Sequence, residues 1–298
     1  MSALVCFGLG YCARVLAKRL QDKGWSVLGT TRSTQRAVAL RALGFEIAIF
    51  DGEQPGKDVQ QALKQATHVL VSIAPGQAGD LVLARHTDDL ALAERLEWIG
   101  YLSTVGVYGD HGGAWVEEDT ALKPTSERSV ARVAAERQWL NFGEAADKPV
   151  HLFRLAGIYG PGRGPLENLR RGKARRIVKP GQIFNRIHVD DITSVLEASI
   201  AHPRGGAIYN VADDEPAPPQ DVVAYAAEVL GACAPPEIAF EDAQLSPMGR
   251  SFYGENKRVS NARIKQELGV ELAYPSYREG MKALAGMDSP AREIVDRD

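Results

Sequence analysis

The stretch Leu4-Val5-Cys6-Phe7-Gly8-Leu9-Gly10-Tyr11-Cys12-Ala13 decides the fold of this chain. Its first four residues are apolar and predict a buried strand, and residues 12–23 carry apolar side chains at helical spacing. Between them lies the pattern G-x-G-x-x-A. Gly8 would permit the tight turn, Gly10 the close approach of a pyrophosphate, and Ala13 close packing of helix on strand. The candidate cofactor-binding residues here are Gly8, Leu9, Gly10, Tyr11, Cys12 and Ala13.

Glycines also mark plain strand–helix turns, so the pattern has two interpretations. Its place at the start of an alternating strand and helix pattern favours a dinucleotide. The phosphates would meet the free amides and the positive dipole end of the first helix.

Short apolar runs alternate with longer helical patterns along the chain, which predicts an α/β fold with a doubly wound parallel sheet. The runs are almost continuously apolar, as expected for strands buried on both faces. Gly24 and Gly44 are expected to end the first two helices. The expected strands are residues 4–7, 26–29, 46–50, 68–72, 98–103, 150–155 and 208–211.

Glycine and proline become frequent after about residue 157, as in Gly160-Pro161-Gly162-Arg163-Gly164-Pro165. Further helices are expected near residues 220–230 and 261–267. We expect a dinucleotide-binding domain made of residues 1–158 and 183–212. A smaller substrate lobe, made of residues 159–182 and 213–298, would lie over the C-terminal edge of the sheet, where α/β proteins bind ligands.

The composition is typical of a soluble globular protein: 298 residues, 45% hydrophobic and 24% charged, with a formal net charge of −3. This balance gives no field for nucleic acid or for an anionic membrane surface. Three cysteines cannot form a disulfide framework, which indicates a reducing cytoplasm. The apolar opening breaks at Gly8 and has no basic leader, so we expect a cytosolic protein that begins at residue 1.

The second expected strand leads into Gly29-Thr30-Thr31-Arg32-Ser33. A site that prefers NAD would place a carboxylate here to hold the ribose 2′-hydroxyl. Arg32, flanked by the hydroxyls of Thr31 and Ser33, suits a 2′-phosphate instead, because a guanidinium binds phosphate through two parallel hydrogen bonds. Arg32 as a solvated residue at a helix start is the alternative. We expect NADP(H), with NAD(H) as the second choice.

Two later segments are expected to complete the cofactor crevice. Asp51 follows the third strand and could accept a hydrogen bond from the adenine amino group, or form a turn before Gly52, or both. Ser72 and Ala74, in Ser72-Ile73-Ala74-Pro75, would line the crevice through their backbone after the fourth strand.

Four ordered stretches resemble the extended short-chain dehydrogenase/reductase superfamily, of the nucleotide-sugar epimerase/dehydratase type. They run from Ser103 to Gly109, from Arg154 to Gly162, from Ile187 to Asp191 and from Gly206 to Val211. The resemblance covers nearly the whole chain. It implies a Rossmann-like sheet, a small C-terminal substrate lobe, and a homodimer formed through the helices after the fourth and fifth strands.

The chain departs from that superfamily in its catalytic pair. The usual Tyr-x-x-x-Lys falls on Arg128 and Arg132, and the glycine pattern is G-x-G-x-x-A in place of G-x-x-G-x-x-G. Arginine stays protonated, so Arg128 cannot exchange a proton with a substrate oxygen. Arg128 could clamp an anion, but a solvated helix residue is favoured. Arg132 could hydrogen-bond the nicotinamide ribose, which we favour over a solvated position.

Other titratable groups stand near this point by family position. Thr104 matches the catalytic Ser/Thr and can hydrogen-bond a carbonyl, but its hydroxyl is too weak an acid to act alone. Tyr108, Tyr159 and His188 are candidates for proton exchange, each with a structural alternative; for His188 the structural role is favoured. Tyr253 and Lys257 have the Tyr-x-x-x-Lys spacing within an expected loop, and we interpret them as a coincidence.

Six cations lie between Arg170 and Lys179, in the stretch that borders the substrate in relatives. They would suit an anionic ligand such as a nucleotide sugar, although a solvated helix face is the more common outcome of such a run. No metal-binding spacing and no G-x-S-x-G pattern is present in the sequence.

Two functions remain open from the sequence. The first is an NADP(H)-dependent oxidoreductase or epimerase-like enzyme acting on a sugar-derived or small carbonyl, with a non-standard proton donor or an ordered water. The second is a cofactor-binding sensor or regulatory protein that has lost its chemistry along with the Tyr–Lys pair.

Overall fold

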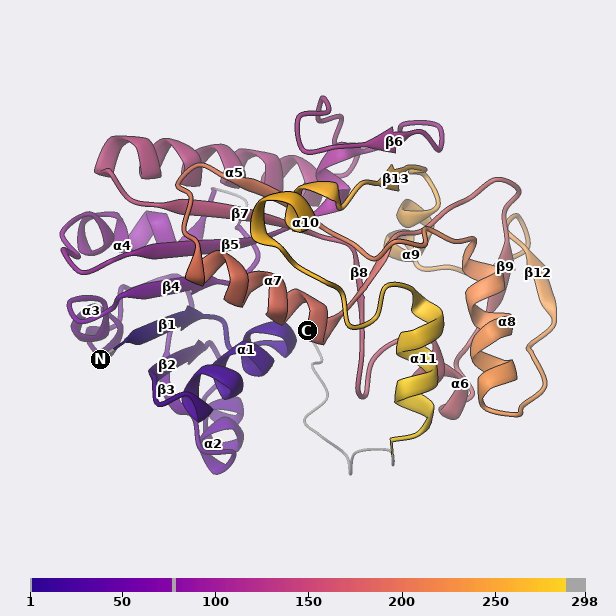
Figure 1. Cartoon of the computed structure of the whole chain (residues 1–298), viewed down its shortest axis with the longest axis horizontal. Helices are drawn as coiled ribbons and strands as arrows, with labels where there is room; N and C mark the ends of the chain where they lie inside the picture. The colour runs from indigo at the N-terminus through magenta and orange to yellow at the C-terminus, as the bar shows by residue number, and fades with distance from the viewer. Residues whose placement is uncertain (1, 77–78, 288–298) are drawn as a thin grey trace.

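A seven-stranded parallel sheet forms the centre of the computed structural model, which describes residues 2–76 and 79–287 (Figure 1). All seven strands expected from the sequence are present, within three residues at either end. Their order makes the sheet doubly wound around β1, as predicted for an α/β fold. In order across the sheet the strands are β11 (Ile208–Val211), β7 (Val150–Leu155), β5 (Trp98–Thr104), β4 (His68–Val71), β1 (Ala3–Phe7), β2 (Ser26–Thr31) and β3 (Glu46–Ile49).

Helices cover both faces of this sheet and bury two apolar clusters, which explains why the central strands are mostly apolar. One face carries α1 (Tyr11–Asp22), α2 (Thr34–Ala42), α7 (Val189–Ala201) and α10 (Ala262–Leu268). The other carries α3 (Lys57–Leu63), α4 (Leu81–Ala91) and α5 (Glu127–Ala146). Gly24 and Gly44 follow the ends of α1 and α2 with φ of +82° and +87°, so both end these helices as expected.

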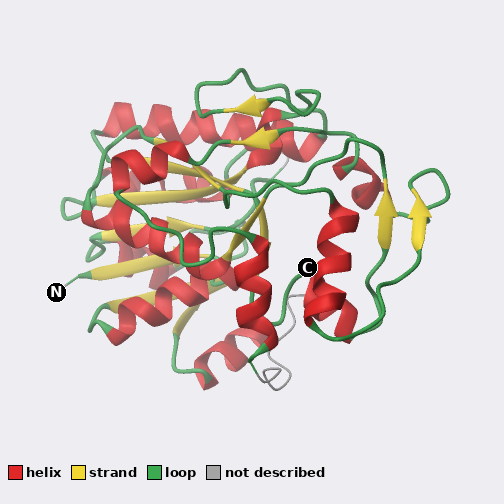
Figure 2. Cartoon of the chain, turned by 45° about the vertical axis from the view of Figure 1, so that its right-hand side comes forward, coloured by secondary structure: helices red, strands yellow, loops and turns green. Residues whose placement is uncertain are grey.

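A smaller group of elements lies at one end of the molecule, with β9 and β12 at its outer margin (Figures 1 and 2). It has two apolar clusters of its own, built around Tyr277 and Met281 and around Ile177 and Tyr253. Its elements are β8 (Gly157–Tyr159), α6 (Pro165–Arg170), β9 (Arg176–Val178), β10 (Arg186–His188), α8 (Pro219–Val229), β12 (Glu237–Ala239), α9 (Pro247–Phe252) and α11 (Tyr277–Ala285). Parallel pairs join β8 to β10 and β9 to β12.

The chain then returns to the sheet before it reaches α11. β13 (Arg258–Val259) pairs with β6 (Trp115–Val116), and Ile264 and Leu268 of α10 pack in the same apolar cluster as α1 and α7. The division into residues 1–158 with 183–212 and residues 159–182 with 213–298 therefore stays a proposal. The packing shows that the later segment contributes side chains to both parts.

Candidate active site and cofactor loop

The loop between β1 and α1 is fixed in shape by its neighbours. Gly8 has φ of +86°, its amide donates to Thr30 Oγ1 at 2.9 Å, and the next amide, of Leu9, donates to the Thr30 carbonyl at 2.8 Å. A Cβ at Gly8 would lie 2.5 Å from Ile73 Cγ2. Only glycine fits this turn, because both the backbone angle and the contact exclude a side chain.

Gly10 has no such reason to be glycine. Its φ of −83° is open to any residue, and a Cβ there would meet nothing closer than Ser72 Oγ at 3.9 Å. Neither backbone strain nor packing within the protein requires the missing side chain. The space in front of Gly10 is therefore open, at the place where the sequence predicts a pyrophosphate.

The start of α1 leaves its backbone donors without a side-chain cap. Gly10 is the N-cap, no side chain accepts a hydrogen bond there, and the first turn has no acidic residue. The first amides of a helix and its dipole attract anions. Leu9, Cys12 and Ala13 are buried, so any contact of theirs with a ligand would run through the backbone.

Of the residues expected around the adenosine end, Thr31 is buried in β2, and the others lie on the surface or in turns. Arg32 is exposed, and Ser33 caps α2 by accepting a hydrogen bond from the Arg36 amide at 3.2 Å. Asp51 forms the expected turn, since its Oδ1 accepts from the Glu53 amide at 2.9 Å. The proposed contact between Asp51 and adenine is compatible with that turn and stays a prediction.

Thr104 ends β5, on the edge of the sheet that also carries the loop after β1. Its Oγ1 accepts a hydrogen bond from the Gly106 amide at 3.1 Å, which leaves the hydroxyl proton to donate elsewhere. The short 3₁₀ helix η1 (Val105–Tyr108) follows directly. Thr104 is thus held in one orientation by the backbone that succeeds it.

The two arginines at the expected Tyr and Lys positions lie in the first turns of α5 and behave differently. Arg132 is half-buried, and its Nη1 donates to the Leu102 carbonyl at 2.7 Å and to the Tyr101 hydroxyl at 3.2 Å. Arg128 is exposed, with its guanidinium 5.7 Å from the ring centre of Phe252 in α9. Arg132 faces the end of β5, and Arg128 faces the smaller group of elements.

A buried ion pair anchors α5 to the sheet beneath these arginines. Arg154 of β7 and Glu136 of α5 are both about 3% exposed and pair at 2.8 Å. Ser103 donates to Glu136, and Arg154 donates to the Tyr108 hydroxyl at 2.9 Å. Tyr108 in turn donates to Asn210 Oδ1 at 2.7 Å. Tyr108 is therefore part of a buried structural network, and its burial raises its pKa.

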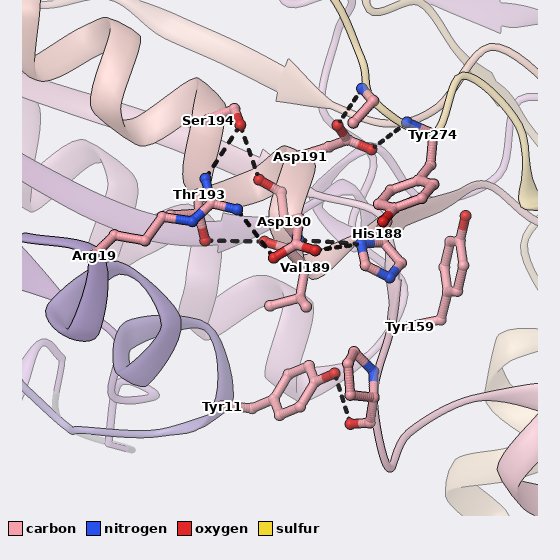
Figure 3. A network of polar contacts seen from close by, with 12 residues as sticks. Tyr11, Arg19, Tyr159, His188, Val189, Asp190, Asp191, Thr193, Ser194 and Tyr274 are labelled. Atoms are coloured by element: carbon pink, nitrogen blue, oxygen red, sulfur yellow. Dashed lines mark hydrogen bonds and ion pairs between the residues drawn. The ribbon is translucent and has the colours of Figure 1, made fainter. Parts of the chain in front are cut away.

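His188 and Tyr159 lie in a second buried network, at the junction of α7 with the smaller group (Figure 3). His188 caps α7 by accepting from the Asp190 amide at 3.2 Å, and its ring lies 4.1 Å from the ring of Tyr274, centre to centre. Burial lowers the pKa of His188 to about 4. The Tyr159 hydroxyl donates to the Ser276 carbonyl at 3.3 Å. The structural role favoured for His188 is present, and so is the structural alternative for Tyr159.

The six cations between Arg170 and Lys179 do not form a helix face, so the expectation of a solvated helix face is wrong. α6 ends at Arg170, and the following residues form a turn and then β9. The cations are engaged within the smaller group: Arg171 pairs with Glu167 at 2.5 Å, and Arg176 pairs with Glu237 at 3.0 Å. Gly172, with φ of +62°, stops the helix early.

Tyr253 and Lys257 share no helix. Tyr253 is the C-cap residue of α9 and packs on Phe240 and Phe184, and Lys257 lies in the loop beyond it. The Lys257 ammonium donates to the Gly109 carbonyl and to Glu255, at 2.7 Å each. Their spacing is a coincidence, as interpreted from the sequence.

Within residues 2–76 and 79–287, no group of three or more metal-ligating side chains comes together. Over the same residues, no helix is both long enough and apolar enough to cross a membrane.

This chain is similar in sequence to known proteins. Residues 3–212 match the NAD dependent epimerase/dehydratase family, which is more than half of the chain. The chain belongs to that family. Protein YeeZ of Escherichia coli (strain K12) is similar to it, with 30% identity over 286 residues that cover 92% of this chain and 97% of YeeZ.

Solved structures extend this likeness. A functionally unknown conserved protein from Silicibacter pomeroyi DSS is 53% identical, with a TM-score of 0.86 over 96% of this chain and 98% of that one. UDP-glucuronic acid 4-epimerase from Bacillus cereus, solved with UDP-glucuronic acid and NAD, has a TM-score of 0.75 at 19% identity, over 95% and 98% of the two chains. This second likeness concerns the fold alone.

The NAD dependent epimerase/dehydratase family implies a dinucleotide cofactor, and the loop after β1 fits one. The open space at Gly10 and the uncapped amides of α1 are what a diphosphate requires. The donor set is neutral or cationic here, with no carboxylate in the first turn. Nothing in the loop would repel the phosphates.

Proposed function

We propose that this chain is an NAD(P)-dependent oxidoreductase or epimerase-like enzyme, acting on a sugar-derived or small carbonyl substrate. The observation that carries the proposal is the open space at Gly10 in front of the uncapped start of α1. It lies in a chain of the NAD dependent epimerase/dehydratase family, in the segment that the family match covers. The candidate cofactor-binding residues are those of this loop together with Thr31, Arg32, Ser33, Asp51, Ser72 and Ala74.

The bound dinucleotide would supply hydride transfer at its nicotinamide ring. Thr104 would donate a hydrogen bond to the substrate carbonyl, and its orientation by the Gly106 amide supports this role. Arg132 would hold the nicotinamide ribose with its remaining N–H groups, since a guanidinium has five donors. Arg128 would contact an anionic group of the substrate. The proton would come from an ordered water or a residue outside the usual pair.

Nucleotide sugars are the substrate class that the structural relatives suggest. The Bacillus cereus epimerase was solved with UDP-glucuronic acid and NAD. For this chain we propose an anionic or nucleotide-sugar substrate, a cytoplasmic location and a homodimer through α4 and α5. Nucleic acid and membrane are not proposed partners, given the formal net charge of −3.

Hydride transfer tests this proposal. The purified protein would be mixed with NADPH or NADP and with panels of sugar nucleotides, aldehydes and quinones, while the nicotinamide absorbance is followed. We expect turnover with one class, reduced about 100-fold or more by Thr104→Ala, because a hydrogen bond to developing charge is worth about 2.7–4 kcal/mol. Ser26→Ala, which removes an exposed hydroxyl at the start of β2, is the matched control and should leave turnover unchanged.

A cofactor-binding sensor is the second candidate, favoured by Arg128 and Arg132. Neither side chain can lose a proton near neutral pH, so the usual proton relay is absent from α5. Tight binding of a dinucleotide with no hydride transfer across the panels would favour the sensor over the enzyme. Failure to bind any dinucleotide would contradict both.

Arg32 tests the choice between NADP and NAD. We expect Arg32→Ala to weaken NADPH binding about 10-fold or more and to change NADH binding less than twofold, because only the former carries the 2′-phosphate. A charge-assisted hydrogen bond is worth about 1.5–3 kcal/mol. Calorimetry with both cofactors measures the difference. Lys64→Ala removes the same charge from an exposed residue just after α3 and is the control. Wild-type protein that binds NADH at least as tightly as NADPH would contradict the preference.

A further inference from the structure

A tight hairpin of residues 160–164 lies against the start of α1. The Gly160 amide donates to the Arg163 carbonyl and the Arg163 amide donates to the Gly160 carbonyl, at 3.0 Å each. Gly162 and Gly164 have φ of +74° and +119°, so the hairpin needs glycine at both positions. The two reciprocal hydrogen bonds give Arg163 a defined place on an otherwise glycine-rich loop.

Tyr11 fastens this hairpin to the cofactor loop. Tyr11 is the first residue of α1, and its hydroxyl donates to the Pro161 carbonyl at 3.0 Å (Figure 3). A Cβ at Gly160 would lie 2.5 Å from that hydroxyl, so the two loops touch without room for a side chain. Residues about 150 positions apart in the sequence are thus held in direct contact at the start of α1.

Arg163 extends from the hairpin over the same helix start. Its guanidinium lies 5.4 Å from the ring centre of Tyr11, and the side chain is exposed. It makes no ion pair with any residue that the structure describes, whereas Arg171, eight residues on, pairs with Glu167. A permanent positive charge therefore lies beside the ring of Tyr11, the first residue of α1, and no carboxylate among residues 2–76 and 79–287 pairs with it.

We infer that Arg163 closes the diphosphate site from the side opposite the glycine loop. The amides of α1 would hold one face of the diphosphate, and the Arg163 guanidinium the other. A guanidinium suits this task because its planar set of donors matches two phosphate oxygens. This inference rests on the proposed function and adds a binding residue from a distant loop, with Tyr11 as the residue that positions it.

Binding of cofactor fragments tests the inference without any substrate. We expect Arg163→Ala to raise the Kd of NADPH and of ADP-ribose at least 10-fold, and that of adenosine 2′-monophosphate less than twofold. Only the first two ligands contain a diphosphate. Arg163→Lys should recover part of the affinity, because it keeps the charge and loses the paired donors. Tyr11→Phe, which removes the hydroxyl and keeps the ring, should raise the Kd of ADP-ribose about threefold.

The matched control is Arg171→Ala, which removes an equal charge from the same segment. It should leave all three dissociation constants unchanged within twofold. Arg163→Ala protein with wild-type affinity for ADP-ribose would overturn the inference, as would an equal loss for adenosine 2′-monophosphate. In either case the proposed function would stand, provided that wild-type protein binds NADPH. Wild-type protein that binds neither NADPH nor ADP-ribose would overturn the proposed function itself.

Discussion

Replacement of Gly10 by aspartate is expected to abolish dinucleotide binding while making the protein slightly more stable. The new side chain would begin at a Cβ whose nearest described neighbour, apart from the adjoining residues of the chain, is Ser72 Oγ at 3.9 Å. It would fill the phosphate position and repel its charge. Several charge-assisted hydrogen bonds of about 1.5–3 kcal/mol each would be lost, so we expect the Kd of NADPH to rise about 100-fold or more.

The same substitution provides a helix cap that α1 lacks. Aspartate is a preferred N-cap residue and interacts favourably with the helix dipole, so the free energy of unfolding should rise by about 0.5 kcal/mol. A higher free energy of unfolding together with weaker NADPH binding would indicate that Gly10 is needed for a ligand and not for the turn. Urea unfolding and calorimetry give the two quantities. A Gly10→Asp protein that binds NADPH as tightly as the wild type would contradict the proposed site.

Two variants control for this result. Ser246→Asp places the same charge at the N-cap of α9, far from the glycine loop in the sequence, and should leave NADPH binding unchanged. Gly8→Ala should instead lower stability, because Gly8 has φ of +86° and its Cβ would meet Ile73 at 2.5 Å. If Gly8→Ala weakens NADPH binding, we therefore expect a lower free energy of unfolding as well.

Replacement of Glu136 by glutamine is expected to cause the largest loss of stability of any single change considered. It would leave the Arg154 guanidinium buried at 3% exposure without its carboxylate. Removal of one partner from a buried ion pair costs about 3–5 kcal/mol. For a chain of this size we expect the Tm to fall by about 10 °C, as measured by calorimetry.

A double variant and a surface pair sharpen this test. Glu136→Leu combined with Arg154→Met removes both charges, and should recover much of the stability that either single variant loses. Glu167→Gln breaks the exposed pair with Arg171 and should cost less than about 1 kcal/mol. A Glu136→Gln protein as stable as the wild type would show that the pair does not anchor α5.

The sheet could be predicted from sequence because its signals are local. Strands such as β1 and β4 are buried along most of their length, and apart from His68 they are apolar. Gly24 and Gly44 mark the ends of α1 and α2 because each adopts a backbone angle that other residues avoid. The cofactor loop belongs to this class, since its glycines lie within three residues of the strand and helix that they join.

The other features of the candidate site depend on contacts between residues that are distant in the sequence. Such contacts produce no periodic sequence pattern. The pairing of Arg154 with Glu136 shows only once β7 and α5 are packed together. The position of Arg163 over Tyr11 requires two loops about 150 residues apart to meet. The cationic run departs from the expected helix face for a related reason: its cations contact partners such as Glu237 and the Gln244 carbonyl far along the chain.

The strands of the sheet are synthesised in the order of the chain, which differs from their order across the sheet. The neighbouring strands β3, β2, β1, β4 and β5 all come from the first 104 residues, so ribosomes complete the portion that bears the glycine loop before they reach Arg163. β7 and β11 extend that portion along one margin afterwards. The nascent protein thus acquires the loop proposed to bind its coenzyme first, and the hairpin with Arg163 emerges later.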